Sequence, residues 1–443
     1  MTRWRASLAA GALFALLPRG AAYAQGDQPA GDPAPPTEPA PEPTAPPEPE
    51  PAPAPVPEVT TAEPAPAEPI AVEEPALPSR PEMERNFAGS IQLDYMWIPT
   101  RESEGETGRD VALDGATAEV SLKVTTDFGH GMSASVKACF ACHGFEVGMA
   151  LFDLRVADEL NVRIGRFSPA FGEFPDRHDP ANHRTSDKPL IYDMGRMLRV
   201  IEWNEGILPA PWVDNGIEVN GTRFFGDHIQ TDYALYAISG PRAGADPVDF
   251  DFRMSRTGDT YYIDNNSRPA LGGQLVLSFI SDTAVVALGA SAMRGTYDPE
   301  HRLPFAIHGA HAVVRVRDVF LRAEYLHRRT AMSLGEDPES RFKYAPGSDG
   351  TYDPDTVKDG GYVELEVPAG KRLTFVARED GLRRRGNVVQ TSELRKDSAI
   401  LRHTAGAAVL LRGSLRLKLS YEYYDFSDFD NESVVHAGIA GAL

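Results

Sequence analysis

The sequence predicts an all-β fold: a transmembrane antiparallel β-barrel of about sixteen strands, preceded by a disordered Pro-rich N-terminal segment. Three observations predict it. The chain opens with an export signal, and no later segment reaches the ~18 to 20 apolar residues that a membrane helix needs. The body of the chain also alternates apolar and polar residues with a period of two, most clearly over 87–97 and 415–423. Such alternation is typical of strands with one apolar and one polar face.

Residues 1–24 read as a signal peptide. Arg3 and Arg5 form its basic start, residues 8–17 its apolar core, and Ala-Tyr-Ala at 22–24 a cleavage site of small residues. The apolar core is too short to cross a bilayer as a helix. We therefore expect an exported mature chain that spans a membrane with strands.

Residues 25–84 are dominated by Pro, Ala and Glu, a composition that cannot bury enough apolar surface to fold. We expect a disordered, extended periplasmic linker. The signal contributes +3 and the linker −12 to the net charge of −20, which leaves −11 for residues 85–443, the expected barrel domain. This acidic balance argues against nucleic acid as a partner, because phosphate contacts need a basic surface.

The alternating segments divide the domain into strands whose connections are short and long by turns. Short turns next to long loops are typical of outer-membrane barrels, where the turns are periplasmic and the loops external. An even number of strands places both ends of the domain on the periplasmic side. The expected strands are 87–98, 111–126, 132–139, 146–157, 160–168, 216–225, 229–239, 270–281, 284–294, 306–316, 319–330, 361–368, 372–380, 400–412, 414–425 and 433–443.

The longest connection, 169–215, holds too many apolar residues for a solvated linker. A connection of this length inside a compact domain is usually functional or disordered. We expect it to fold into the barrel and narrow the pore. Its apolar residues are Phe171, Phe174, Leu190, Ile191, Tyr192, Met194, Met197, Leu198, Ile201 and Trp203.

The stretch VRIGRFSPAFG at 162–172, followed by this loop and a return strand at 216–221, resembles the bacterial outer-membrane porins. It looks most similar to the sixteen-stranded phosphate-selective porin O/P type, in which a similar stretch precedes the constriction loop. The resemblance implies an outer-membrane protein surrounded by lipid, passive diffusion of small polar solutes or ions, and a homotrimer. The lysine-rich pore positions of that family are replaced here by a loop of mixed charge, so phosphate specificity is not carried over.

Strand parity selects the charged side chains that face the barrel interior, because Lys or Arg at mid-depth on the lipid face costs about 2 to 4 kcal/mol. Opposite charges across a constriction set selectivity by field and diameter. Together with charged residues of the loop, the candidate pore-lining residues are Arg155, Arg163, Arg177, Arg184, Lys188, Arg322, Glu324, Glu364, Arg378, Arg416 and Lys418.

The chain has two cysteines, and both fall in the run Cys139-Phe140-Ala141-Cys142-His143. C-x-x-C-H resembles the attachment signature of c-type haem, in which two thiols form thioethers and the His ligates the iron. Three interpretations stay open: haem c held by Cys139, Cys142 and His143, a local disulfide in an oxidising compartment, or a site for another metal. With haem, the function would be electron transfer, and the candidates for a distal ligand are Met132, Met149, His178 and His183.

The sequence gives no positive sign of an enzyme. It contains no G-x-S-x-G elbow, no H-E-x-x-H and no phosphate-binding loop. Ser168 or Ser186 beside His178 or His183 could form part of a hydrolytic site, but no motif supports that arrangement. We expect a protein without enzymatic activity.

Overall fold

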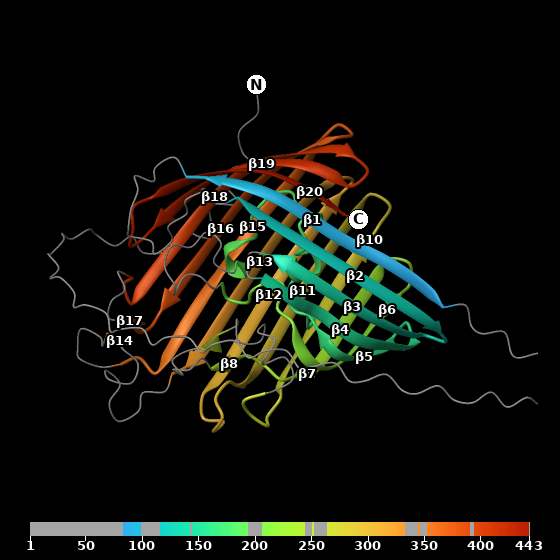
Figure 1. The fold of residues 1–443 in the computed structure, drawn as a ribbon, viewed down its shortest axis with the longest axis horizontal. Helices are drawn as coiled ribbons and strands as arrows, with labels where there is room; N and C mark the ends of the chain where they lie inside the picture. The colour runs from blue at the N-terminus through green and yellow to red at the C-terminus, as the bar shows by residue number, and fades with distance from the viewer. Residues whose placement is uncertain are drawn as a thin grey trace, which may run out of the picture. The chain divides into compact units, whose positions relative to one another are not determined.

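Sixteen antiparallel strands close into one barrel (Figure 1). The structure is a computed structural model that describes residues 83–98, 116–141, 144–193, 206–243, 250–251, 264–332, 344–345, 352–389 and 394–442. Of the two compact units of the chain, Met1–Arg80 and Pro81–Leu443, all described residues belong to the second. The predicted signal peptide and nearly all of the predicted linker lie outside the described residues.

The barrel strands follow one another around the ring in chain order, each hydrogen-bonded to the next. Alternating apolar faces and short turns favour this meander, since every backbone group finds a partner in an adjacent strand. The strands are β1 (Glu84–Trp97), β2 (Thr117–Gly129), β3 (Met132–Ala141), β4 (Gly144–Ala157), β5 (Leu160–Phe167), β6 (Asp214–Phe225), β7 (Ile229–Ile238), β10 (Ala270–Ile280), β11 (Ala284–Thr296), β12 (Pro304–Val316), β13 (Val319–Ala331), β15 (Asp355–Ala369), β16 (Leu373–Arg385), β18 (Asp397–Arg412), β19 (Leu415–Phe426) and β20 (Glu432–Ala442).

The first and last strands close the ring. β1 pairs antiparallel with β20 from Ser90 opposite Ala442 to Trp97 opposite Val435. No barrel strand is left with an unpaired edge, so the bilayer meets no exposed row of backbone groups. The prediction of a sixteen-stranded antiparallel barrel is confirmed.

Two small sheets lie outside the barrel ring, in the connections between barrel strands. One pairs β8 (Arg242–Ala243) with β9 (Phe250–Asp251), and the other pairs β14 (Tyr344–Ala345) with β17 (Val388–Val389). Among the described residues, no helix has the length and apolar character needed to cross a membrane.

The outer face of the barrel is apolar, as the alternation predicts. Large side chains with outward parity stay exposed along the strands, which suits contact with lipid. Aromatic rings mark both ends of this band, the pattern of membrane interfaces. Exposed aromatic residues are Phe87, Phe224, Phe225 and Phe279 towards the short turns, and Tyr95, Trp97 and Phe140 towards the long loops.

The expected boundaries of β15 and β16 are wrong. The alternation predicts these strands at 361–368 and 372–380, but they extend to Asp355 and Arg385 at the long-loop end. The extra residues include Gly360 and a run of three arginines. Outside the bilayer a strand needs only a paired neighbour and no apolar face, so the pairing continues where the alternation stops.

Candidate functional site

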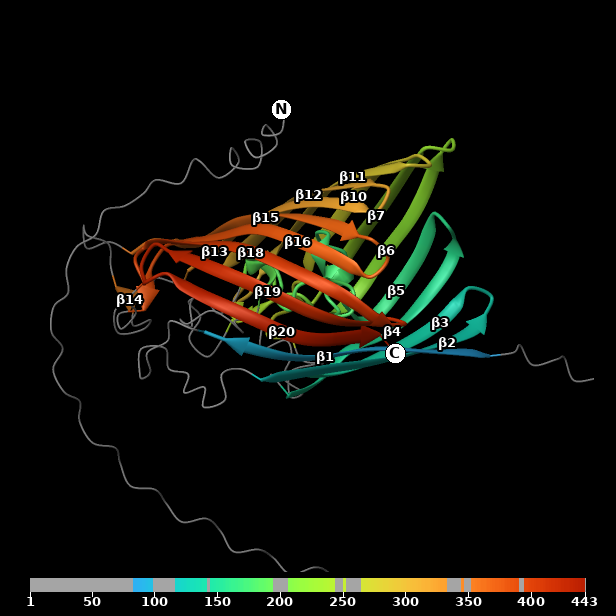
Figure 2. The same cartoon turned by 90° about the horizontal axis from the view of Figure 1, so that it is seen from above.

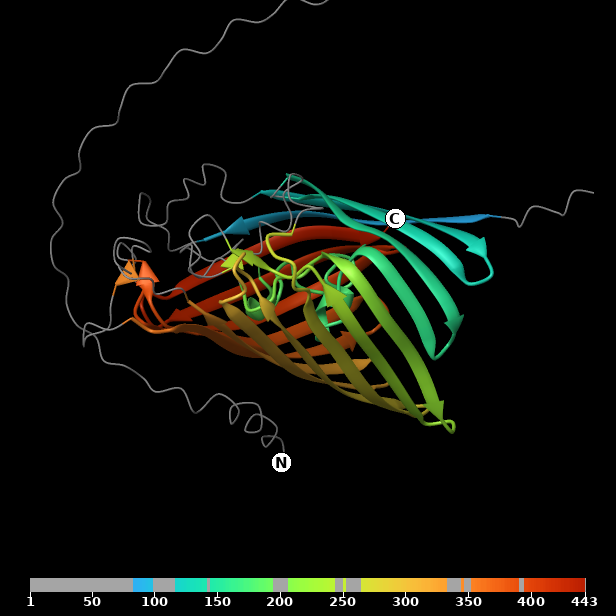
Figure 3. The ribbon, with the colours of Figure 1, turned by 90° about the horizontal axis from the view of Figure 1, so that it is seen from below.

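The segment between β5 and β6 lies inside the ring of strands (Figures 2 and 3). We call residues 168–213 the inner loop; its described parts are 168–193 and 206–213. It contains two short 3-10 turns, η1 (Phe174–Arg177) and η2 (Leu190–Tyr192). Pro175 stands in the first turn of η1, where its missing N–H costs nothing.

Apolar packing fixes the inner loop against the barrel wall. Phe174 stacks on Tyr192 with ring centroids 5.5 Å apart. The two described arms also bond to each other, because the Ile191 carbonyl accepts the N–H groups of Ile207 (2.8 Å) and Leu208 (3.1 Å). Buried apolar residues of the loop are Phe171, Phe174, Leu190, Ile191, Tyr192, Ile207, Leu208, Trp212 and Val213.

Glu324 of β13 receives the first turn of the inner loop. Its carboxylate accepts the backbone N–H of Glu173 (2.9 Å) and of Phe174 (3.4 Å). It also accepts the hydroxyls of Tyr192 (2.6 Å) and of Tyr362 from β15 (3.2 Å). A buried carboxylate with several donors is a strong anchor, since each of these polar groups would otherwise lose its partner.

Gly172 lets the chain pass this anchor. Its φ of +72° is a left-handed conformation, and a Cβ there would overlap the Tyr192 hydroxyl and a Glu324 oxygen. The Gly172 N–H donates to Ser291 Oγ at 3.0 Å, and its carbonyl accepts Gln274 Nε2 at 2.6 Å. Strands β10, β11 and β13 therefore hold the same three-residue stretch of the loop.

Arg402 of β18 is the centre of a second anchor. Its guanidinium contacts Asp187 of the loop at 2.5 Å, Asp380 of β16 at 2.9 Å and Glu422 of β19 at 3.2 Å. It also donates to the Lys188 carbonyl at 2.5 Å. The side chains of Arg402, Asp380 and Glu422 are 0 % exposed, so these charges depend on one another rather than on water.

Arg378 of β16 extends this anchor. It pairs with Asp380 at 2.6 Å and with Glu364 of β15 at 3.4 Å. It also donates to Thr185 Oγ1 at 3.0 Å and to the Asp187 carbonyl at 3.3 Å. One guanidinium thus joins two wall strands to the loop.

Basic residues of β19 bind carbonyl groups of the loop. Lys418 Nζ donates to the carbonyls of Pro180 (2.6 Å) and Thr185 (3.1 Å), and Arg416 donates to that of Ala181 (2.6 Å). Irregular backbone inside a barrel leaves carbonyl groups without backbone partners, and the side chains of Lys418 and Arg416 donate the missing hydrogen bonds. The wall of β13 to β19 is therefore built to receive this loop.

Arginines at the edge of the loop share the remaining carboxylates of β15. Arg177 contacts Glu364 at 3.0 Å and Glu173 at 2.8 Å. Arg322 of β13 contacts Glu366 at 2.7 Å and Glu173 at 3.2 Å. Arg184 contacts Glu366 at 3.6 Å, and Lys188 donates to the Ala210 carbonyl at 2.8 Å. Both side chains are partly exposed at the surface of the loop.

The opposite wall carries charges in contact with water. Arg163 of β5 lies between Asp153 of β4 (3.0 Å) and Glu218 of β6 (3.2 Å). The side chains of Arg163 and Asp153 are 28 % and 21 % exposed, whereas Glu218 is buried and accepts the Ala170 N–H of the inner loop at 3.1 Å. Arg155 pairs with Asp158 at the short-turn rim, where both are largely exposed. Here a solute would meet charged groups directly.

Two histidines of the inner loop are held neutral. His183 is buried with both ring nitrogens unpartnered among the described residues, and its ring lies 5.7 Å from that of Phe174. Burial and the nearby positive charge of Lys418 lower the pKa of His183 well below its ordinary value. Burial also lowers the pKa of His178 to about 4.

The structure thus divides the predicted pore-lining residues into two groups, and a pore-lining role stays a prediction for both. Arg322, Glu324, Glu364, Arg378 and Lys418 lie buried where the loop meets the wall. The less buried group is Arg155, Arg163, Arg177, Arg184, Lys188 and Arg416. Asp380 and Tyr362 were missed, although the parity that selects Arg378 and Glu364 also selects them.

One cluster has the composition of a metal site. Ligand atoms of Asp187, Glu422 and His436 lie within 4.8 Å of one another. The Arg402 guanidinium already contacts both carboxylates, and His436 pairs with Asp94 at 2.9 Å. The side chain of Arg402 therefore supplies the positive charge that a metal ion would bring.

The predicted haem site is described only in part, because Cys142 and His143 lie outside the described residues. Cys139 of β3 has no disulfide within the described chain. It shares inward parity with Lys137, which contacts Asp179 of the loop at 2.6 Å. A group attached to Cys139 would therefore sit in the long-loop mouth of the barrel, and attachment itself stays a prediction.

A closed sixteen-stranded barrel with an apolar outer band, a charged interior and a loop folded into that interior is the architecture of outer-membrane barrels of the porin type. Comparison with solved structures agrees. The outer membrane channel DcaP of Acinetobacter baumannii matches with a TM-score of 0.50 and 11 % identity, over 82 % of this chain and 97 % of that one. This likeness shows the fold.

Two further structures resemble the chain more loosely. OmpF of Salmonella typhi, in complex with daunomycin, has a TM-score of 0.48 and 13 % identity, over 81 % of this chain and 97 % of that one. An anion-selective porin from Comamonas acidovorans has 0.47 and 12 %, over 82 % and 100 %. No protein-family model and no curated protein matches the sequence.

Proposed function

We propose that the protein is an outer-membrane porin through which small polar solutes diffuse passively, with the inner loop setting the width of the passage. The observation that carries this proposal is the attachment of the inner loop to the wall of β13 to β19 by buried ion pairs, opposite a wall on which Arg163 and Asp153 stay partly exposed. A catalytic site needs a nucleophile or metal beside a base. The best metal-like cluster among the described residues is occupied by Arg402, so the proposal includes no enzymatic activity.

The proposal includes no preference for phosphate. Partly exposed interior groups carry both signs: Lys123, Arg163 and Arg184 are positive, and Glu119, Asp153 and Asp179 are negative. Interspersed charges of both signs do not form a filter for one sign of ion. The homotrimer rests on the sequence resemblance alone, and the mass of the detergent-solubilised barrel tests it.

Single-channel recording in a planar bilayer tests the role of the loop. Deleting residues 175–200 should raise the conductance, because the deletion removes both 3-10 turns from the interior. A smaller deletion, of the eight residues 336–343 in the connection between β13 and β15, controls for the loss of residues from another loop. Equal conductance of the wild type and the 175–200 deletion would refute the role of the loop in setting the pore width.

Haem attachment is the second candidate, and the observation that favours it is the inward parity of Cys139. Reduced and oxidised absorption spectra of the mature protein, with a haem stain of a denaturing gel, test it. An α-band lost in Cys142→Ala would add electron transfer to the barrel. A colourless wild-type protein would leave the porin function alone.

A further inference from the structure

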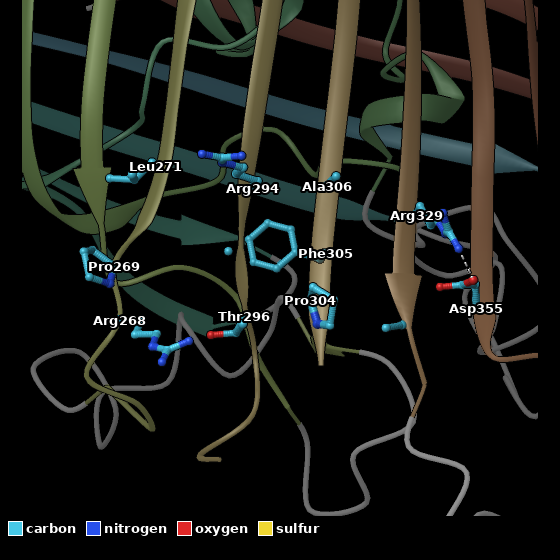
Figure 4. Close-up of a pocket in the computed structure, with 12 residues that line it drawn as sticks. Arg268, Pro269, Leu271, Arg294, Thr296, Pro304, Phe305, Ala306, Arg329 and Asp355 are labelled. Carbon is cyan, nitrogen blue, oxygen red and sulfur yellow. Dashed lines mark hydrogen bonds and ion pairs between the residues drawn. The ribbon is translucent and has the colours of Figure 1, made fainter. Parts of the chain in front are cut away.

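The outer face of β10 to β15 has a basic pocket at the long-loop end, and it plays no part in the passage. A cavity of about 740 Å³ opens there, with the arginines shown in Figure 4 around it. Arg268 comes from the residues before β10, Arg294 from β11 and Arg329 from β13. Arg294 pairs in register with Leu271 and Ala306, whose parity is that of the exposed outer leucines.

The pocket carries excess positive charge. Arg329 contacts Asp355 at 2.5 Å, which neutralises one guanidinium (Figure 4). Arg268 and Arg294 are exposed, and neither has an ion pair with another residue of the described chain. Two guanidinium groups without a carboxylate partner in the part of the chain that the structure describes favour an anionic ligand, and phosphate suits the planar donors of arginine.

The depth of the pocket is the depth of lipid headgroups. Arginine on the lipid face is costly at mid-membrane, and the cost falls towards the interface. The pocket lies at the ends of its strands, beside the long loops, which in this class of barrel face outwards from the cell. Its arginines are therefore placed level with the headgroups of the outer leaflet.

An apolar groove continues from the pocket along the lipid face. This second cavity, of about 510 Å³, shares Leu271 and Arg294 with the first. Small residues form its floor, since Gly273 and Ala292 leave the sheet surface bare and a Cβ on Gly273 would lie 2.6 Å from the Ala234 carbonyl oxygen. Leu235, Leu271 and Leu275 form the sides of the groove.

We propose that this surface binds a phosphorylated lipid of the outer leaflet. The lipid phosphate contacts Arg268 and Arg294, and one acyl chain lies in the groove over Gly273 and Ala292. A charged head site joined to an apolar channel matches an amphipathic ligand better than a soluble anion, which would not need the groove. The proposal goes beyond passive diffusion and does not depend on it.

Native mass spectrometry of the full barrel in mild detergent, with bisphosphorylated lipid A added, tests the proposal. Arg268→Ala/Arg294→Ala should weaken retention of the lipid by about tenfold or more, because two charge-assisted contacts are lost. Ala292→Phe should weaken it by filling the groove. Arg223→Ala is the control, since Arg223 is also exposed but lies at the short-turn end of the barrel.

Further measurements keep the test decisive if a variant folds poorly. Dephosphorylated lipid A should bind the wild type weakly, and 1 M salt should reduce retention of the phosphorylated form. Equal retention of both lipids, or equal retention by the double variant and Arg223→Ala, would overturn the proposal. The proposal would also be overturned if the wild type formed an oligomer without lipid and the pocket variants did not. The surface would then be a subunit interface.

Discussion

The two walls of the barrel interior use the same residue types in different ways. Under the inner loop, Arg378 and Arg402 and their partners Asp380 and Glu422 have side chains that are 0 % exposed. On the opposite wall, the Arg163 side chain is 28 % exposed. Charges removed from water must be paired, so those of the first wall serve to hold the loop. Only charges like those of the second wall remain available to a passing solute.

Replacing one buried guanidinium is the strongest way to test this contrast. Arg402→Met should cost about 3 to 5 kcal/mol of stability, because three carboxylates lose their shared cation. Arg155→Met, at the exposed Arg155–Asp158 pair, should cost about 1 kcal/mol or less. Urea unfolding of both variants in the same detergent measures the difference. Similar losses would mean that the loop-covered wall is no more dependent on its charges than the open rim.

A second test separates loop docking from backbone strain. Gly172→Ala forces a Cβ against Tyr192 and Glu324 at φ +72°, whereas Gly226→Ala has nearly the same φ, +66°, with no atom near the new Cβ. Left-handed strain alone costs about 1 to 2 kcal/mol. We therefore expect both variants to lose that amount of stability. Gly172→Ala should also loosen the loop, which single-channel recording would show as increased current noise. If Gly172→Ala channels showed no more current noise than the wild type, the Glu324 anchor would not control the width of the passage.

The smallest expected effect depends on pH. A histidine whose pKa is lowered by burial favours the docked loop above its ordinary pKa of 6.5, and this contribution is lost as pH falls below that value. His183 faces Lys418, Lys188, Arg177 and Arg378, so a proton there is strongly opposed. Between pH 6.5 and pH 5.5, protonation of this histidine should weaken docking of the loop by about 1.4 kcal/mol or less.

Single-channel traces between pH 7 and pH 5.5 measure the pH effect as more frequent loop fluctuations in acid. His183→Phe keeps an aromatic ring against Phe174 and should remove a large part of the dependence. His178, whose pKa is about 4, should account for part of the remainder. An unchanged pH profile in His183→Phe would assign the effect to other groups.

The alternation of side chains was enough to predict the barrel, because a strand between lipid and water has to switch polarity at every residue. It failed at Asp355 and Arg385, where the strands leave the bilayer and that requirement ends. Parity likewise placed Arg378 and Glu364 on the interior face. Parity could not show that Arg378 and Glu364 are buried, because the loop that covers them is irregular and its sequence has no periodic pattern from which its path could be predicted. The contacts of Asp187 with Arg402 and of Glu173 with Arg322 join residues far apart in the chain.

The pairing of β1 with β20 has a consequence for how the protein is made. The first strand cannot obtain its second neighbour until the last residues of the chain have been synthesised and delivered. The ring therefore closes last, in whatever order the other strands pair. A copy cut short by a premature stop would hold two open edges, the usual templates for aggregation. Closure of the ring thus requires the complete set of strands from β1 to β20.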